Sequence, residues 1–440
     1  MVPGLKTALV LGGGAARGAY EAGVVSWLRE ALPRETGAPL RLDILAGTSV
    51  GAVNACYLAT RASDHAQQAR TLAERWKALK LEDVLRVGPT DLARLALDLV
   101  RRTPHQAGRS RRAGMIDPRG LQEIASRHVV WREIGRCIEA GSLEALVVTA
   151  THVASGCTTV FVQRHAKAPP PPMCVNPHYR AVSTRIGLKH AMASAAIPVL
   201  FPPVSLGGEL YVDGGLRQNV PLSPALRLGA QRVVVVTLRH AGEVGQPPPV
   251  VEAERALAAH PGAPIEEPRE LALPSGPFLF GKALDTLLND RVEEDLDRLR
   301  RTNALLEAGT RAYGPGFARL LNSTLLPMQG QPVRYVRTLV VRPSQDLGRL
   351  AAEFARSPEF RRRASGFAGR LVRRLADSEA PDQADLASYL MFDGAFAEIL
   401  IDLGRRDAAA RLGEWLRFCS DDPESEVEAA QLEELRALGG

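Results

Sequence analysis

A serine between two glycines has the spacing of a hydrolytic nucleophile. Ser49 lies in Gly-Thr-Ser-Val-Gly at residues 47–51, directly after an apolar run at residues 42–46. In a G-x-S-x-G motif between a strand and a helix, the glycines permit a sharp turn because they lack a Cβ, and the serine hydroxyl is left exposed. The motif therefore favours acyl transfer by Ser49, supported by Gly47 and Gly51. A helix N-cap or turn serine is the structural alternative.

A serine hydroxyl is a poor nucleophile at neutral pH, so it needs a base and hydrogen-bond donors for the oxyanion. The sequence offers one carboxylate in a suitable place. Asp213 precedes Gly214 and Gly215 at the end of a short apolar stretch. We expect Asp213 at a strand terminus, where functional groups of α/β sheets gather. Asp-Gly-Gly is also ordinary turn chemistry.

A glycine-rich loop near the N-terminus could hold an anion. Residues 12–18, with the sequence GGGAARG, connect an expected strand to an expected helix, so their bare amides can converge on negative charge. A dinucleotide site with Asp43 as ribose partner is a rival interpretation. The fingerprint G-x-G-x-x-G fails, however, because Arg17 occupies the last glycine position and Gly18 comes one residue late. Close packing of strand and helix is a further alternative.

Composition limits the class of protein. The 440 residues, 45% of them hydrophobic, are enough for one large domain with an extension, or for two to three domains. The five cysteines are scattered, without metal-ligand or disulfide spacing, which favours a reducing compartment. No apolar run approaches the length of a membrane span, and the apolar run at the start of the chain, residues 7–11, is too short for a signal-peptide core. We therefore expect a cytoplasmic protein. With few aromatics (5%) and a net charge of only +6, nucleic-acid binding is not expected.

Apolar runs alternate with helical patterns in the first half of the chain, which predicts an α/β fold with a mostly parallel sheet. The Gly207-Gly208 turn predicts a hairpin ending at Asp213. The expected strands are 7–11, 42–46, 145–150, 158–163, 204–206, 209–212, 232–238 and 335–341.

The rest of the chain is expected to consist of loops and helices. Proline and glycine predict surface loops at 166–177 and 241–277. Beyond residue 343, helical periodicity predicts helices at 350–360, 367–375, 386–403 and 408–418. We therefore expect a main domain over 5–345, with its motifs in 5–225 and a linker at 241–277, and a C-terminal helical extension over 346–440 packed on it.

Together, these motifs resemble the patatin-like phospholipases, acyl hydrolases with a serine–aspartate dyad, and in particular their bacterial members. The resemblance covers roughly residues 5–225 and is carried by the blocks 11–24, 47–55, 194–203, 213–215 and 219–221. It implies a three-layer α/β/α patatin-like fold with a mostly parallel central sheet. It also implies that Ser49 is the nucleophile and Asp213 the dyad carboxylate.

The resemblance further implies an oxyanion hole formed by the amides of Gly13, Gly14 and Ala15, with Gly12, Arg17 and Gly18 in the supporting loop. Many members have a third glycine where Ala15 stands, so which amides donate is left open. A dyad favours esters over amides, and we expect cleavage of lipid or phospholipid esters through an acyl-enzyme, without metal or cofactor. A phospholipase A or lysophospholipase activity is the expected type.

Three alternatives remain open. A Ser-His-Asp triad would need a histidine after Asp213, and only His240 and His260 qualify, with His240 at the end of an expected strand. The protein could also keep the fold as a silent binding scaffold. Finally, residues 91–102 predict an amphipathic helix followed by Arg109, Arg111 and Arg112, which either packs on the core or contacts an anionic membrane.

Overall fold

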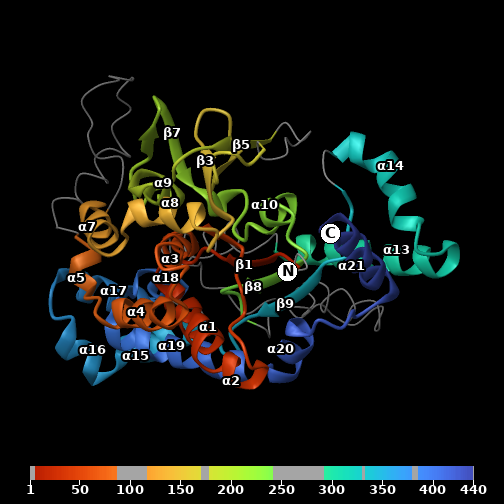
Figure 1. The fold of residues 1–440 in the computed structure, drawn as a ribbon. Coiled ribbons are helices and arrows are strands. Elements are labelled where there is room, and N and C mark those ends of the chain that lie inside the picture. Colours follow the sequence, from red (N-terminus) through yellow and green to blue (C-terminus); the bar gives the residue numbers. More distant parts are fainter. Residues whose placement is uncertain are drawn as a thin grey trace, which may run out of the picture.

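Nine strands form one mixed sheet in the part of the chain that the structure describes (Figure 1). This computed structural model describes residues 5–86, 116–169, 178–240, 292–329, 332–378 and 385–439. The strands are β1 (Thr7–Leu11), β2 (Ile44–Thr48), β3 (Ala145–His152), β4 (Thr158–Arg164), β5 (Tyr179–Ser183), β6 (Val204–Leu206), β7 (Glu209–Asp213), β8 (Arg232–Val236) and β9 (Arg337–Val341).

The main path of the sheet has the order β5-β4-β3-β2-β1-β8-β9. The pairs from β3 through β2, β1 and β8 to β9 are parallel, whereas β4 runs antiparallel to β3. The expected hairpin is present: β6 pairs with β7, and Gly207 and Gly208 both adopt positive φ in its turn. The mostly parallel α/β sheet predicted from the sequence is therefore confirmed.

Helices cover both faces of the sheet. They are α1 (Ala19–Glu30), α2 (Leu32–Thr36), α3 (Val50–Ala59), α4 (His65–Lys77), α5 (Leu81–Val84), α7 (Arg119–His128), α8 (Trp131–Glu139), α9 (Leu188–Ser194), α10 (Leu222–Arg227), α13 (Val292–Tyr313), α14 (Phe317–Gln329), α15 (Leu347–Arg356), α16 (Pro358–Arg363), α17 (Phe367–Ser378), α18 (Asp385–Leu390), α19 (Gly394–Ala409), α20 (Leu412–Cys419) and α21 (Glu426–Gly439). Two short 3-10 helices, η1 (Ala15–Gly18) and η2 (Gly214–Leu216), complete the set of described helices.

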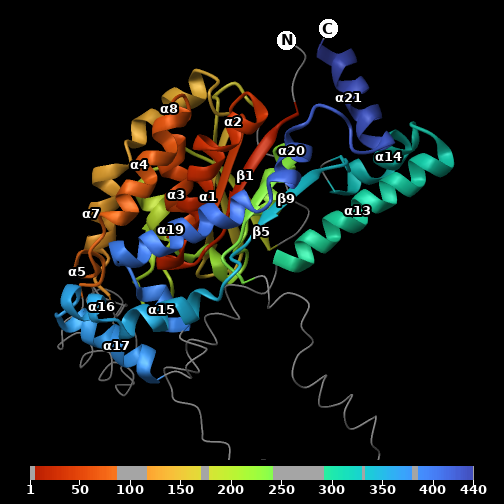
Figure 2. The ribbon, with the colours of Figure 1, turned by 90° about the horizontal axis from the view of Figure 1, so that it is seen from below.

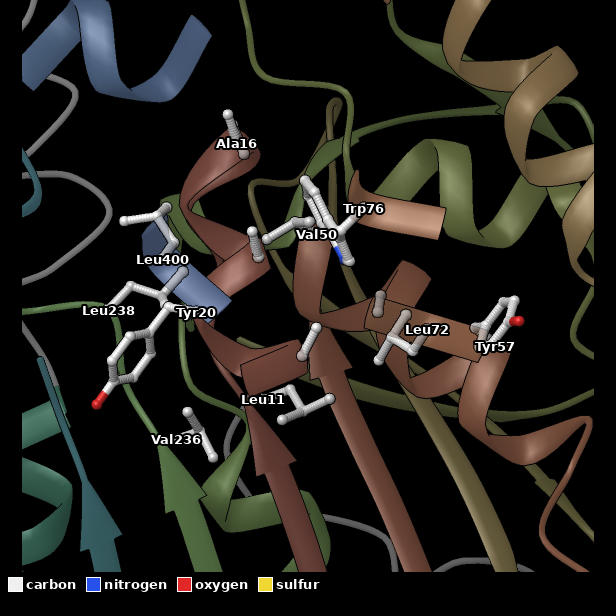
Figure 3. Close-up of a cluster of buried hydrophobic side chains, with 14 of the residues drawn as sticks. Leu11, Ala16, Tyr20, Val50, Tyr57, Leu72, Trp76, Val236, Leu238 and Leu400 are labelled. Carbon is white, nitrogen blue, oxygen red and sulfur yellow. The ribbon is translucent and has the colours of Figure 1, made fainter. Parts of the chain in front are cut away.

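Alternating side chains of each strand enter two different cores, as the pleat requires. In β1, Leu9 and Leu11 pack with residues of α1, α3 and α19, whereas Ala8 and Val10 pack with residues of α10 and α13. Figure 3 shows part of the first core, where Leu400 of α19 lies beside Tyr20 of α1. The molecule is thus a three-layer α/β/α structure, as expected.

The C-terminal helices pack directly on the first core. Helix α19 lies along α1 (Figure 2), and the two backbones meet at glycines. A Cβ on Gly23 would lie 2.1 Å from the carbonyl oxygen of Ile401, and one on Gly404 would lie 2.3 Å from that of Tyr20. Because either contact would be a clash, the two helices depend on these glycines to approach this closely.

Several expectations about secondary structure were wrong. The predicted helix at 350–360 is interrupted at Ser357, which caps the start of α16, and the predicted helix at 408–418 is interrupted between the end of α19 at Ala409 and the start of α20 at Leu412. The predicted helix at 386–403 is broken after Leu390, and Asp393 starts α19 by accepting a hydrogen bond from the Ala395 amide at 2.8 Å. Strand β5 was not predicted. Its side chains are all half-buried or exposed, so it lacks the apolar run of a central strand.

Several predicted segments lie outside the described residues: the amphipathic helix at 91–102 with Arg109, Arg111 and Arg112, the linker at 241–277 with His260, and 170–177 of the proline-rich loop. None of the described helices is both long and apolar enough to cross a bilayer.

Candidate active site

The sheet brings Ser49 and Asp213 together along one edge of β3. Up to Thr149, this edge pairs with β2, where Thr48 faces Thr149. The next residue, Ala150, pairs instead with Asp213 of the antiparallel strand β7. Strand β2 therefore ends where β7 ends, and Ser49, which follows Thr48, meets Asp213 beside Ala150.

The backbone at Ser49 has the sharp turn that the motif predicts. Ser49 has φ 55° and ψ −125°, an uncommon conformation for a residue with a side chain. A Cβ on Gly47 would lie 2.2 Å from the Gly51 carbonyl oxygen, and a Cβ on Gly51 would lie 2.4 Å from that of Leu11. The two glycines are thus required because backbone segments touch here, and the turn places Ser49 at the N-terminus of α3.

The Asp213 carboxyl is buried and only partly satisfied. Its Oδ1 accepts a hydrogen bond from the Gly215 amide at 2.7 Å, whereas Oδ2 has no hydrogen-bond partner among the described residues. Burial raises the pKa of Asp213 to about 7, although the nearby Ser49 hydroxyl and the Gly215 amide both lower it. The Ser49 hydroxyl therefore approaches the carboxyl without closing a regular hydrogen bond to Oδ2. Such contacts are often long before substrate binds.

The glycine loop packs against Ser49. A Cβ on Gly13 would lie 3.0 Å from the Cβ of Ser49 and 2.2 Å from Asn219 Oδ1, so only glycine fits there. The Gly13 amide donates to the Asn219 carbonyl at 3.1 Å, and the Asn219 side-chain amide donates to the Gly13 carbonyl at 3.1 Å. Because the Gly13 amide is already used, it is a poorer oxyanion donor than the sequence suggested.

The amides of Gly14 and Ala15 form no hydrogen bond with the described residues. Ala15 also lines the same pocket as Ser49. Its φ of 50° lies in the left-handed region, which explains why glycine is suited to this position. These two amides are therefore the best-placed donors of the loop.

The supporting residues of the loop have structural contacts. A Cβ on Gly12 would lie 3.3 Å from the Val236 carbonyl oxygen, and one on Gly18 would lie 2.5 Å from the Val50 side chain. A Cβ on Gly214 would lie 2.5 Å from the Thr149 carbonyl oxygen. Arg17 is buried, and its Nε donates to Ser388 Oγ of α18 at 2.7 Å. The loop is thus held between the sheet, α3 and the C-terminal helices.

Of the two histidines considered for a triad, only His240 is among the described residues, and its ring contacts a backbone carbonyl. His240 Nε2 lies 3.1 Å from the Ser344 carbonyl oxygen, and His260 lies outside the described residues. Since Asp213 Oδ1 is bound to Gly215 and Oδ2 to no described residue, the geometry favours a Ser49–Asp213 pair over a triad with His240.

An apolar pocket begins at Ser49 and runs along α3. Ser49, Val53 and Tyr57 are spaced i, i+4 and i+8, so they form one face of the helix. The opposite walls come from α4, α7 and the break between α18 and α19, which contribute Trp76 and Phe392 among other residues. Besides Ser49, the lining residues with polar side-chain groups are Asn54, Tyr57, Arg75, Trp76 and His128. A pocket of this shape and polarity suits a hydrocarbon chain.

A larger cavity, of about 830 Å³, lies between α10, α13 and α14 on the other face of the sheet. Its walls carry several charged side chains, including Arg298 and Asp295, and neither Ser49 nor Asp213 lines it. The candidate active site is therefore the smaller pocket beside Ser49.

Sequence reasoning gave no role to two residues that fix the site. Ser194 Oγ accepts a hydrogen bond from the Ser49 amide at 2.8 Å, and Asn219 clamps Gly13 as described above. Both residues stand in blocks that carry the family resemblance, which was the available signal. The pocket wall at Phe392 had no such signal.

Comparison with protein-family models matches residues 9–226 to the family described as Patatin-like phospholipase. A search of curated proteins found no match. The matched range contains the glycine loop, Ser49 and Asp213, and it ends before α13. Membership of this family implies a lipid acyl hydrolase activity. The chain belongs to the patatin-like phospholipase family.

Proposed function

We propose that this protein cleaves carboxylic esters of lipids through a Ser49–Asp213 dyad and an acyl-enzyme. The observation that carries the proposal is the juxtaposition of Ser49 with a buried carboxyl whose Oδ2 has no partner among the described residues, next to an apolar pocket. The raised pKa of Asp213 makes it a stronger base toward an alcohol than an ordinary aspartate.

In the first half-reaction, Ser49 Oγ attacks the ester carbonyl carbon while its proton moves to Asp213 Oδ2. The amides of Gly14 and Ala15 donate to the resulting oxyanion, and the N-terminus of α3 favours negative charge at the site. The tetrahedral intermediate then expels the alcohol, which takes the proton from Asp213. The acyl group remains bonded to Ser49.

In the second half-reaction, Asp213 takes a proton from water as the water oxygen attacks the acyl-enzyme. Collapse of this intermediate returns the proton to Ser49 and releases the fatty acid. The acyl chain would lie in the pocket along α3, where burial contributes about 0.8 kcal/mol per methylene. We propose phospholipids and lysophospholipids as the substrates, consistent with the family.

A lipid panel tests this proposal. Phosphatidylcholine, lysophosphatidylcholine and monoacylglycerol are incubated with the wild type, Ser49→Ala and Asp213→Asn, and released fatty acid is measured. Ser26→Ala is the matched control, because Ser26 is a buried serine of α1 whose hydroxyl has no partner among the described residues. We expect release by the wild type and Ser26→Ala, and a loss of at least about 1,000-fold in the other two variants. A wild type that releases no fatty acid from any ester would instead favour the binding scaffold.

A further inference from the structure

The C-terminal segment from Ser388 to Phe392 reaches the candidate site, although it lies outside the range matched by the family model. We propose that this segment is part of the active site: Ser388 and Tyr389 position the glycine loop through Arg17, and Phe392 sets the acyl-chain preference of the pocket. The proposal rests on the proposed function, because it assigns the pocket to the acyl chain.

The first contact is made by Arg17. Its guanidinium lies 4.0 Å from the centre of the Tyr389 ring, and Nε donates to Ser388 Oγ at 2.7 Å. A second guanidinium nitrogen donates to the Tyr389 hydroxyl at 3.4 Å. A buried guanidinium needs such partners, because removing it from water is costly. Helix α18 therefore contributes to holding this side chain in place.

Arg17 is connected to the candidate oxyanion donors through the backbone. It lies two residues after Ala15 in η1, and its amide donates to the Gly14 carbonyl at 3.1 Å. A displacement of Arg17 would therefore be passed to both Gly14 and Ala15. Oxyanion stabilisation depends steeply on the placement of the donors, so Ser388 and Tyr389 act as positioning residues.

The second contact is the pocket wall. Phe392 is buried and stacks on Trp76, with ring centroids 6.4 Å apart and planes at 8°. Both rings line the pocket that begins at Ser49. Trp76 is fixed in turn, because its Nε1 donates to Asn54 Oδ1 at 3.1 Å. Figure 3 shows Trp76 beside Val50 of α3.

The position of Phe392 is fixed by contacts on its C-terminal side. The Gly394 amide donates to the Leu79 carbonyl at 2.9 Å, and a Cβ on Gly394 would lie only 2.0 Å from the Lys77 carbonyl oxygen. Lys77 also forms an ion pair with Glu398 at 2.7 Å. The break between α18 and α19 is therefore anchored on the C-terminal end of α4 and the residues that follow it, so Phe392 forms a rigid wall.

The pocket wall from Ser49 to Tyr57 spans about 12 Å along α3, at about 1.5 Å per residue. If the Phe392 ring closes the pocket, it limits the length of the acyl chain that the pocket can hold. Replacing Phe392 with a smaller side chain should therefore favour longer acyl chains. Differences of a few methylenes in an apolar pocket change kcat/KM by about 10-fold or more.

The test uses the full chain with p-nitrophenyl esters from four to sixteen carbons. For Phe392→Ala, we expect the ratio of kcat/KM for long to short chains to rise about tenfold over the wild type. The control is Phe396→Ala, because Phe396 is also buried but packs on Phe354, with ring centroids 5.7 Å apart, and does not line the pocket. It should lose stability without changing the ratio. An unchanged ratio in Phe392→Ala would overturn this part of the inference.

Binding separates the failure of this inference from that of the proposed function. In a Ser49→Ala background, displacement of cis-parinaric acid by fatty acids of different length needs no catalysis. Adding Phe392→Ala should shift the preferred fatty-acid length in this binding assay toward longer chains, even if the wild type cleaves no ester. An unchanged length preference in this assay would contradict the assigned wall, whatever the hydrolysis assay shows.

The positioning role has its own readout. Tyr389→Leu removes the ring and the hydroxyl beside Arg17, whereas Tyr389→Phe keeps the ring. We expect Tyr389→Leu to lower kcat about tenfold for all chain lengths with KM unchanged, and Tyr389→Phe to restore most of the loss. Equal kcat in the wild type and Tyr389→Leu would contradict the positioning role.

Discussion

Ser49 and Asp213 meet because β2 and β7 share one edge of β3, with Ala150 at the junction. The two residues are 164 positions apart in the sequence. Antiparallel pairing of β7 brings the carboxyl to the same point from the opposite direction, so its approach does not depend on a flexible loop. This arrangement makes the pair rigid, which is a condition for proton transfer between fixed groups.

The raised pKa of Asp213 predicts the pH dependence of ester cleavage. The carboxyl must be ionised to accept the Ser49 proton, so activity is absent at low pH and appears as pH rises through about 7. We expect kcat/KM to rise about tenfold per pH unit below that value and to level off above it. Initial rates with a short-chain ester measure this. An activity that is maximal at pH 5 would contradict the role of Asp213.

The same pKa predicts an effect on stability. Because burial raises the folded-state pKa above the unfolded value, the contribution of Asp213 to stability is present below about pH 4 and is lost as pH rises to about 7. Asp213→Asn does not ionise, so it should gain stability relative to the wild type between pH 4 and 8, by at most about 4 kcal/mol. Urea unfolding of the wild type and Asp213→Asn, at both ends of this pH range, measures the difference in their free energies of unfolding. The other titrating groups are the same in both proteins, so their contributions cancel in this difference. No gain at pH 8 would contradict the buried, raised carboxyl.

The backbone of Ala15 predicts a tolerated substitution. At φ 50° an alanine is strained, and glycine removes this strain at some cost in unfolded-state entropy. We expect Ala15→Gly to keep ester turnover and to change the free energy of unfolding by about 1 kcal/mol or less, in the stabilising direction. Ala16→Gly is the control. Ala16 has no positive φ, so glycine relieves no strain there, and this variant should have a lower free energy of unfolding than the wild type. If Ala15→Gly were destabilised as much as Ala16→Gly, the strain at Ala15 would be refuted.

The contact of His240 predicts that it is dispensable for chemistry. Its ring is bonded to the Ser344 carbonyl, away from the carboxyl oxygens of Asp213. We expect His240→Ala to retain kcat within about threefold, whereas removal of a triad histidine costs several orders of magnitude. Circular dichroism and a thermal melt verify folding. Loss of nearly all turnover in a folded His240→Ala protein would restore the triad.

The strand ends that carry Ser49 and Asp213 were predicted from the sequence more closely than the contacts around them. The glycines around Ser49 and the hairpin ending at Asp213 are local features, so their strand termini could be placed from residue types alone. The use of the Gly13 amide by Asn219 could not be foreseen, because it depends on two loops 206 residues apart. Which amides of the loop donate is likewise a property of the folded backbone.

The C-terminal region shows a second reason for failure. Apolar periodicity continues across residues 386–403, so the break at Phe392 was not predicted. Only the Asp393-Gly394 pair signals a new helix start, and such a pair also occurs in turns. The contact between α18 and Arg17 joins residues 371 positions apart, and no local pattern encodes such a pairing.

Covalent labelling shows whether Ser49 is a nucleophile activated by Asp213. The wild type and Asp213→Asn are treated with a fluorophosphonate, digested, and analysed by mass spectrometry. We expect one adduct on the peptide containing Ser49, formed at least about 100-fold more slowly in Asp213→Asn. Ester hydrolysis by a wild-type protein that carries no adduct at Ser49, or labelling at an undiminished rate without the Asp213 carboxylate, would contradict the dyad.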